Sequence, residues 1–96
     1  MKNITLDNGY KCKINENILN DIRFLEIYSD ALEGSTIDSI KVINLLLGEE
    51  QKEKLYEKLE EKDKDGNVIV PADKVFEAVI DIIAAVNVDD EETGKN

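Results

Sequence analysis

Residues 35–48, STIDSIKVINLLLG, are the segment that most restricts how this chain can fold. A helix that is apolar around most of its circumference has to be covered on several sides, so we expect this segment at the centre of a helical bundle. Ser35 and Asp38 predict a capping box at its start, and Gly48 predicts a left-handed residue just past its last turn. The polar stripe consists of Asp38, Lys41 and Asn44, and the apolar residues are Ile37, Ile40, Val42, Ile43, Leu45, Leu46 and Leu47.

The charge balance restricts the classes of partner. The 96 residues include 12 Lys and Arg against 22 Asp and Glu, a net charge of -10. Because phosphate contacts require Lys and Arg, this balance argues against nonspecific binding to nucleic acid or to an anionic membrane. It favours solubility, a basic partner or mimicry of a polyanion. The apolar runs are too short for a membrane span and no leader pattern opens the chain, so we expect a cytoplasmic protein.

The inventory of reactive side chains is small. Histidine is absent and Cys12 is the single cysteine, which excludes a histidine base, a zinc site of the usual ligands and an internal disulfide. We expect Cys12 to be a small buried hydrophobic side chain. No phosphate-binding glycine loop or nucleophile motif occurs. The sequence therefore predicts a protein that is not an enzyme and has no catalytic residue and no cofactor.

The N-terminal segment predicts a β-hairpin. A two-residue turn would mix apolar and charged side chains on one face of the hairpin. A three-residue loop with Gly9 in the left-handed region instead pairs Leu6 with Tyr10 and Ile4 with Cys12, which gathers the apolar side chains on one face. We expect that face to lie on the helices, because two strands alone are marginally stable.

Asn15 is expected to cap a helix that runs to about Glu33. Phe24, Ile27 and Ala31 widen its apolar arc beyond a single contact face. These three residues are covered either by a second element such as the hairpin or by a partner protein, for which they are the first candidate contact strip. The main stripe, expected to face the core, is Ile18, Ile22, Leu25, Tyr28 and Leu32.

A further helix is expected from Glu49 to about Lys62, with acidic residues favoured in its first turn. Its only apolar residues are Leu55, Tyr56 and Leu59, a narrow stripe on an otherwise charged helix. We expect it to lie on the surface, with most of its charges simply solvated. The stripe is the second candidate contact strip for a partner.

The remaining segment predicts a turn, a short extended run and a last helix. Asp63–Asn67 is the turn, residues 68–70 are extended ahead of Pro71, and the helix runs from Ala72 to about Asn87. Its core face is expected to consist of Val75, Phe76, Val79, Ile80, Ile83 and Val86.

These elements predict a mainly α fold, a small four-helix domain with a short N-terminal β-hairpin. One domain would span residues 1–87, with the hairpin at 1–14. Residues 88–96 are acidic, small and aperiodic, and we expect a disordered tail there.

Residues 61–72 partly match a calcium-binding EF-hand loop. Oxygen ligands, the glycine and the apolar residue fall at loop positions one, three, five, six and eight. Position twelve, which should supply a bidentate Glu, is Ala72, so binding would be weak and we expect no metal site. The simpler interpretation is a turn that is rich in Asp and Gly for conformational reasons. The matching residues are Glu61, Asp63, Asp65, Gly66 and Val68.

The chain as a whole resembles the small tail assembly chaperones of siphophages and prophages of Gram-positive bacteria. The resemblance covers residues 1 to about 87 and rests on four features: the opening ITLDNGYKCKINENILND, the helical LLLGEEQKEKLYEKL, the turn DKDGNVIVP and the closing amphipathic helix. It involves no catalytic signature.

The resemblance implies a function in tail assembly inside the host cell. Members are thought to coat or recruit the long helical tape measure protein, to keep it soluble while tail tube protein polymerises around it, and to be absent from the mature virion. Many are made in two forms by ribosomal frameshifting, and Gly94-Lys95 is what a GGA-AAA slippery site would encode. The strips expected to bind the partner are Phe24, Ile27 and Ala31, and Leu55, Tyr56 and Leu59.

Two other non-catalytic functions remain open. The first is an acidic protein-binding module such as a DNA-mimic inhibitor, which needs carboxylates regularly spaced on one face, whereas Glu and Lys alternate through residues 49–64. The second is a degenerate EF-hand-like calcium-binding module.

Overall fold

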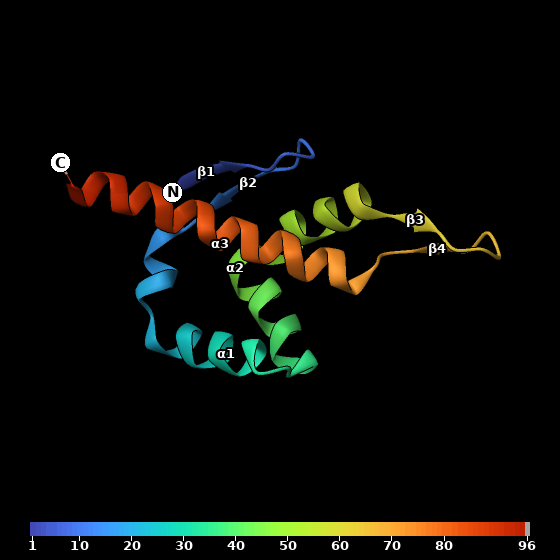
Figure 1. Ribbon diagram of the computed structural model, residues 1–96, viewed down its shortest axis with the longest axis horizontal. Coiled ribbons are helices and arrows are strands. Elements are labelled where there is room, and N and C mark those ends of the chain that lie inside the picture. The colour runs from blue at the N-terminus through green and yellow to red at the C-terminus, as the bar shows by residue number, and fades with distance from the viewer. Residues whose placement is uncertain (96) are drawn as a thin grey trace.

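The computed structural model describes residues 1–95, with side chains described for residues 1–87. The fold is mainly helical, with 64% of the residues in helices, and it carries the expected N-terminal hairpin. It has three α-helices and one 3-10 helix rather than four α-helices (Figure 1). In chain order the elements are β1 (Lys2–Thr5), β2 (Lys11–Ile14), η1 (Glu16–Asn20), α1 (Ile22–Leu32), α2 (Thr36–Leu59), β3 (Glu61–Lys62), β4 (Val68–Ile69) and α3 (Ala72–Lys95).

Helix α2 merges the two helices that were expected on either side of Gly48. At Gly48 the backbone has φ 75° and ψ 170°, so the helix is sharply kinked there. Helical geometry resumes at once, so no loop separates the two halves. Ser35 caps the start of α2 as predicted, because its hydroxyl accepts a hydrogen bond from the Asp38 backbone N–H at 3.2 Å. The helix ends at Leu59, and residues 61–62, expected to be helical, form β3 instead.

The helix expected from Asn15 to Glu33 is divided in two at Asp21. Asn15 caps the short 3-10 helix η1, with its side chain 3.1 Å from the Asn17 backbone N–H. Asp21 has extended backbone geometry, and its carboxylate accepts from the Arg23 backbone N–H at 2.9 Å. The division has a local cause, since Asp21 is itself a good N-cap and starts α1 in a new orientation.

The hairpin has the predicted three-residue loop and register. Ile4 pairs with Cys12, and the Leu6 N–H donates to the Tyr10 carbonyl at 2.9 Å. Gly9 has φ 90°, the left-handed conformation that the loop requires. The apolar face is covered as expected, because β1 lies against α3 and β2 against α2. Its buried side chains are Ile4, Tyr10, Cys12 and Ile14.

Gln51, one turn after the kink, joins α2 to the hairpin. Its side-chain amide accepts from the Lys13 N–H at 2.6 Å and donates to the Lys13 carbonyl at 3.0 Å, so it pairs with β2 much as a neighbouring strand would. The same amide nitrogen donates to the Leu47 carbonyl at 2.8 Å. The Tyr10 hydroxyl adds a fourth bond by donating to the Gln51 backbone carbonyl at 2.8 Å. The three bonds to Tyr10 and Lys13 fix the hairpin on the second half of α2, and the bond to Leu47 holds the Gln51 side chain in place within the helix.

Helix α3 provides one long wall of the core (Figure 1). The predicted core face is correct for Val75, Val79, Ile83 and Val86, whereas Ile80 is 48% exposed. Helix α3 is assigned as far as Lys95, beyond the end expected near Asn87, and Asn96 lies outside the described residues. The disorder expected for residues 88–96 stays a prediction. No proline interrupts these residues, and extending an existing helix requires no new nucleation.

We predict that Gly48→Ala destabilises the protein by about 1–3 kcal/mol, because a side chain is strained at this positive φ. No other heavy atom lies within 4 Å of the added Cβ, so the cost comes from the backbone and not from a clash. Urea unfolding followed by circular dichroism measures the change. The control Asn44→Ala, at an exposed position of the same helix, should stay within about 0.5 kcal/mol of the parent. Equal stability of the two variants would contradict the kink.

Candidate functional site

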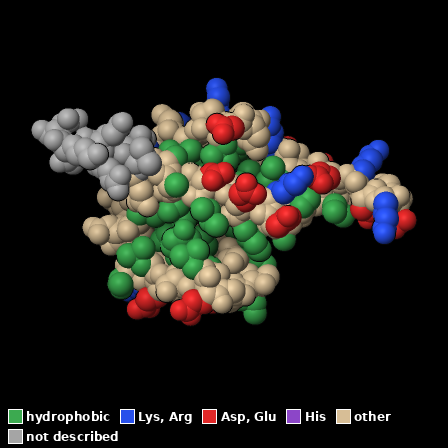
Figure 2. Space-filling model, in the orientation of Figure 1, with side chains coloured by type: hydrophobic (Ala, Val, Ile, Leu, Met, Phe, Trp, Pro, Cys, Tyr) green, Lys and Arg blue, Asp and Glu red, His purple; other side chains and the backbone are tan. Residues whose placement is uncertain are grey.

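An apolar groove lies between the three α-helices. It forms an open hollow of about 130 Å³, and on the face shown in Figure 2 hydrophobic side chains gather across the area between α1 and α3. Each helix contributes residues spaced three or four apart, which is the spacing of one helix face. The lining residues are Tyr28 and Ala31 from α1, Ser39, Val42 and Ile43 from α2, and Phe76, Val79 and Ile80 from α3.

The groove has a buried floor and an open rim. Val42, Ile43 and Val79 form the floor and are almost fully buried, whereas Ile80 is about half exposed at the rim. The one hydroxyl from α2, that of Ser39, donates to the Ser35 carbonyl of its own helix at 3.0 Å. Because that hydroxyl already has a partner, the α2 side of the groove presents an apolar surface to a ligand.

Several large apolar side chains outside the groove also face solvent. We call them the outer apolar side chains. The most exposed are Ile37 on α2, at 71%, and Ile22 on α1, at 66%. Singly exposed apolar side chains are common, but Ile22 and Leu25 line one shallow hollow on α1, and apolar surface gathered in this way can serve binding. The set is Ile22, Leu25, Leu32, Ile37, Ile40 and Leu45.

These residues correct two expectations. The predicted core stripe of the first helix is wrong at Ile22, Leu25 and Leu32, which face solvent. The central position expected for residues 35–48 is only partly correct. Val42, Ile43, Leu46 and Leu47 are buried, but the face that carries Ile37, Ile40 and Leu45 is uncovered.

The first strip expected to bind a partner is largely core. Phe24 is only 2% exposed and stacks on Tyr28 with ring centroids 6.0 Å apart. Ile27 and Ala31 are half-buried against the core, and only Ala31 reaches the groove. This face of α1 is buried because its side chains are large: turning Phe24 and Tyr28 inward buries two aromatic rings at once.

The second strip is also mostly covered. Leu55 is fully buried, and Tyr56 and Leu59 are half-buried against the core. The kink at Gly48 redirects this half of α2 toward the hairpin, so its stripe is not free on the surface. Phe24 and Leu55 could touch a partner only if the domain opened.

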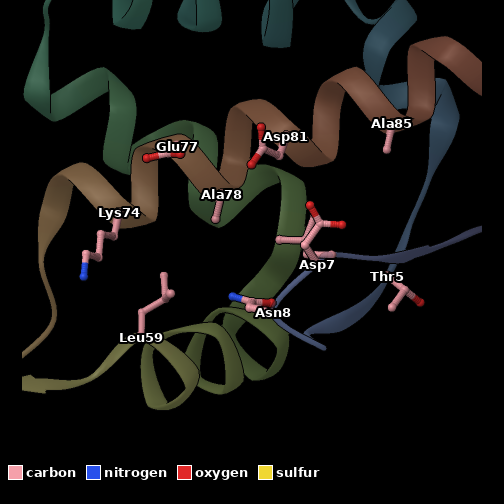
Figure 3. A pocket seen from close by; sticks show the side chains of 10 residues that line it. Thr5, Asp7, Asn8, Leu59, Lys74, Glu77, Ala78, Asp81 and Ala85 are labelled. Atoms are coloured by element: carbon pink, nitrogen blue, oxygen red, sulfur yellow. The ribbon is translucent and has the colours of Figure 1, made fainter.

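A second, more polar cleft lies between the hairpin loop, the end of α2 and α3 (Figure 3). It has a volume of about 590 Å³, with Leu59 and Ala78 among its lining and the carboxylates of Asp7, Glu77 and Asp81 around it. Lys74 forms an ion pair with Glu61 at the start of β3. In the part of the chain that the structure describes, no group of three or more acidic or cysteine side chains could hold a metal ion.

The loop that partly matched an EF-hand connects β3 and β4. The Asp63 carboxylate accepts from the Asp65 and Asn67 backbone N–H groups, each at 2.9 Å. These bonds favour the ionised form and lower the pKa of Asp63. Asp63 therefore stabilises the turn of a small hairpin. This agrees with the simpler interpretation, in which the turn is rich in Asp and Gly because of its backbone conformation.

Cys12 lies on the buried face of the N-terminal hairpin. Burial disfavours the thiolate and raises the pKa of Cys12 to about 11. Burial also raises the pKa of Tyr10 well above its ordinary value, and the nearby Cys12 adds to that increase. A high thiol pKa and a buried sulfur are the opposite of what a nucleophilic cysteine requires.

The acidic surface is interrupted by lysines. On α2, Lys52 Nζ lies 3.1 Å from Glu49 Oε2 and Lys54 Nζ lies 3.5 Å from Glu50 Oε1. Such exposed pairs contribute little to stability, but they break up any regular array of carboxylates.

No protein-family model, curated protein or solved structure matches this chain. Among the described residues, no helix combines the length and apolar character that a membrane crossing requires. The site is therefore defined by its own geometry, an apolar groove and the outer apolar side chains.

We predict that Cys12 reacts with a disulfide reagent at pH 8 only as fast as the protein unfolds. The unfolded thiol titrates near pH 9.0 and the folded one near pH 11, so stability is constant below about pH 9 and falls between these values as unfolding releases a proton. Reaction rates with and without urea, and unfolding curves at pH 7 and pH 10, measure both effects. Rapid reaction of the native thiol would contradict its burial.

Proposed function

We propose that this protein is a non-catalytic holding protein that binds an apolar segment of another protein, in the manner of a phage tail assembly chaperone for the tape measure protein. The observation that carries the proposal is the uncovered apolar surface. The groove and the outer apolar side chains together place large Ile and Leu side chains in water on all three α-helices.

The energetics favour binding at this surface. Covering one exposed Ile or Leu side chain contributes about 1.5–3 kcal/mol, so covering three or four of them offsets a substantial part of the entropy lost on association. A partner that is itself apolar along one side gains in the same way, and its exposed surface stays protected from aggregation until assembly.

The negative net charge also suits a holding protein. A value of -10 makes free copies repel one another, which offsets the tendency of an exposed apolar surface to self-associate. The resemblance to tail assembly chaperones supplies the specific partner, the tape measure protein. It also supplies the place of action, the host cytoplasm before the virion is complete.

Co-expression with a candidate tape measure protein from the same genome tests the proposal. We predict that the tagged wild-type protein keeps this partner soluble and is recovered with it. Ile80→Glu, which places a charge on the rim of the groove, should reduce recovery about tenfold, because the contact of one apolar side chain is lost.

The matched control is Val68→Glu, which adds the same charge at an exposed position on β4, in the projecting hairpin of Figure 1. It should leave recovery unchanged, and both variants should keep the melting temperature of the parent. Absence of capture by the wild-type protein, or equal capture by the two variants, would contradict the proposal.

A further inference from the structure

We propose that the outer edge of β1 binds an extended acidic segment of another protein, which adds to the N-terminal hairpin as a third strand and places its carboxylates beside Lys11 and Lys13. This surface shares no residue with the apolar groove, so the inference does not rest on the proposed function. Three observations carry it: the direction of the β1 backbone groups, the open space on both faces of the strand, and the charge of the outer face of the hairpin.

The backbone groups of β1 that point away from β2 have no hydrogen-bond partner among the described residues. In an antiparallel pair, residues that bond to the partner strand alternate with residues whose N–H and C=O groups point outward. Lys13 is of the second kind, since both of its backbone groups bond to the Gln51 side chain. Its cross-strand partner Asn3, and Thr5 two residues further on, therefore direct their groups to the outer edge of β1. Such an unpaired edge is a template for another strand.

Open space borders this edge on both faces of the hairpin. On the side of α3 lies the polar cleft of Figure 3, which Thr5 lines together with Ala78 and Ala85. On the outer face lies another open hollow, of about 770 Å³, which Asn3 and Thr5 also line. An added strand would alternate its side chains between these two spaces, because successive residues of a strand point to opposite faces.

The outer face of the hairpin is basic, although the whole chain has a net charge of -10. Residues 1–14 contain three lysines and one aspartate. Lys11 and Lys13 are exposed in the outer hollow, and within the part of the chain that the structure describes neither forms an ion pair. Lys54 borders the same hollow and lies 3.5 Å from Glu50, the one acidic residue of its lining. Charges more than about 8 Å away are screened at physiological salt, so these lysines determine the charge that a segment meets here.

An extended polypeptide fits this surface better than a nucleic acid or a second copy of the chain. Backbone donors and acceptors that alternate along an edge match a peptide backbone, which presents the same groups in return. A nucleic acid longer than the hairpin would meet the acidic remainder of the molecule. A second copy that paired through its own β1, with the sequence KNIT, would bring no carboxylate to Lys11 and Lys13.

Fluorescence anisotropy with the full chain and labelled synthetic peptides tests the inference. The probe is a peptide of about nine residues, the length of a long strand, in which glutamate alternates with threonine. We expect it to bind about tenfold more tightly than the same peptide with glutamine in place of glutamate, because two or three exposed charge pairs are lost. The difference should shrink as the salt concentration is raised.

Two further peptides, N-methylated at every glutamate or at every threonine, separate strand addition from general attraction between charges. Alternate amides of a strand point to opposite edges, so only one of the two peptides loses the amides that face β1. That peptide should lose binding, and the other should keep it.

Protein variants locate the site. Lys11→Gln combined with Lys13→Gln should weaken binding about tenfold at an unchanged melting temperature, because both side chains are exposed. The matched control is Lys62→Gln combined with Lys64→Gln, which removes the same charge from exposed positions of the β3–β4 hairpin and should bind as the wild type does.

Asn3→Pro removes an outward N–H that the pairing with β2 does not use, and it should abolish binding while the hairpin still forms. If this variant fails to fold, the N-methylated peptides make the same test from the side of the ligand.

Equal binding of the glutamate and glutamine peptides, or undiminished binding of both N-methylated peptides, would overturn the inference. An oligothymidine of the same length that binds as tightly as the glutamate peptide would overturn it in favour of a general anion site. Light scattering that shows a dimer which Asn3→Pro converts to a monomer would overturn it in favour of a second copy.

Discussion

The kink of α2 at Gly48, which brings the Gln51 side chain into pairing with the Lys13 backbone, is the constraint on which the arrangement of the other elements depends. Gln51 reaches β2 because Gly48 adopts a conformation open to glycine and turns the second half of α2 toward the hairpin. The hairpin is therefore held over the second half of α2 and against α3, and it does not extend over the first half. As a result the most apolar segment of the chain is covered on one side by α1 and α3 and left open on the other, where Ile37 and Leu45 meet water.

The sequence predicted those parts of the fold that local chemistry decides. The register of the N-terminal hairpin followed from Gly9 and from the need to keep apolar residues on one face, and the start of α2 followed from Ser35. The orientation of α1 could not be predicted, because both of its arcs are apolar and periodicity does not rank one above the other. The signal that could have corrected it is Asp21, a better helix cap than its neighbours, which starts α1 six residues after Asn15. The candidate site was missed, because Phe24 and Leu55 were candidate partner contacts and Ile80 was expected in the core, whereas the structure buries the first two and leaves Ile80 about half exposed.

An uncovered apolar surface and a large negative charge are opposing properties that one molecule has to balance. Apolar side chains in water favour association with anything apolar, including other copies of the chain, and the charge restricts which associations follow. The groove adds a preference for apolar groups, because its floor is buried and its lining is almost entirely apolar. The reactive groups contribute nothing to this function, since Cys12 is buried with a raised pKa and Asp63 is engaged in its own turn.

The most direct test is the solvent exposure of individual methyl groups in the free protein, measured by NMR as line broadening by a soluble paramagnetic reagent. The account predicts strong broadening for Ile22, Ile37 and Ile80, which are exposed, and protection for Ile14, Ile82 and Leu55, which are buried. Protection of Ile37 and Ile80 equal to that of Ile14 would mean that the apolar face is already covered in the free chain. That result would contradict the claim that the apolar face is exposed in the free protein and available to bind a partner.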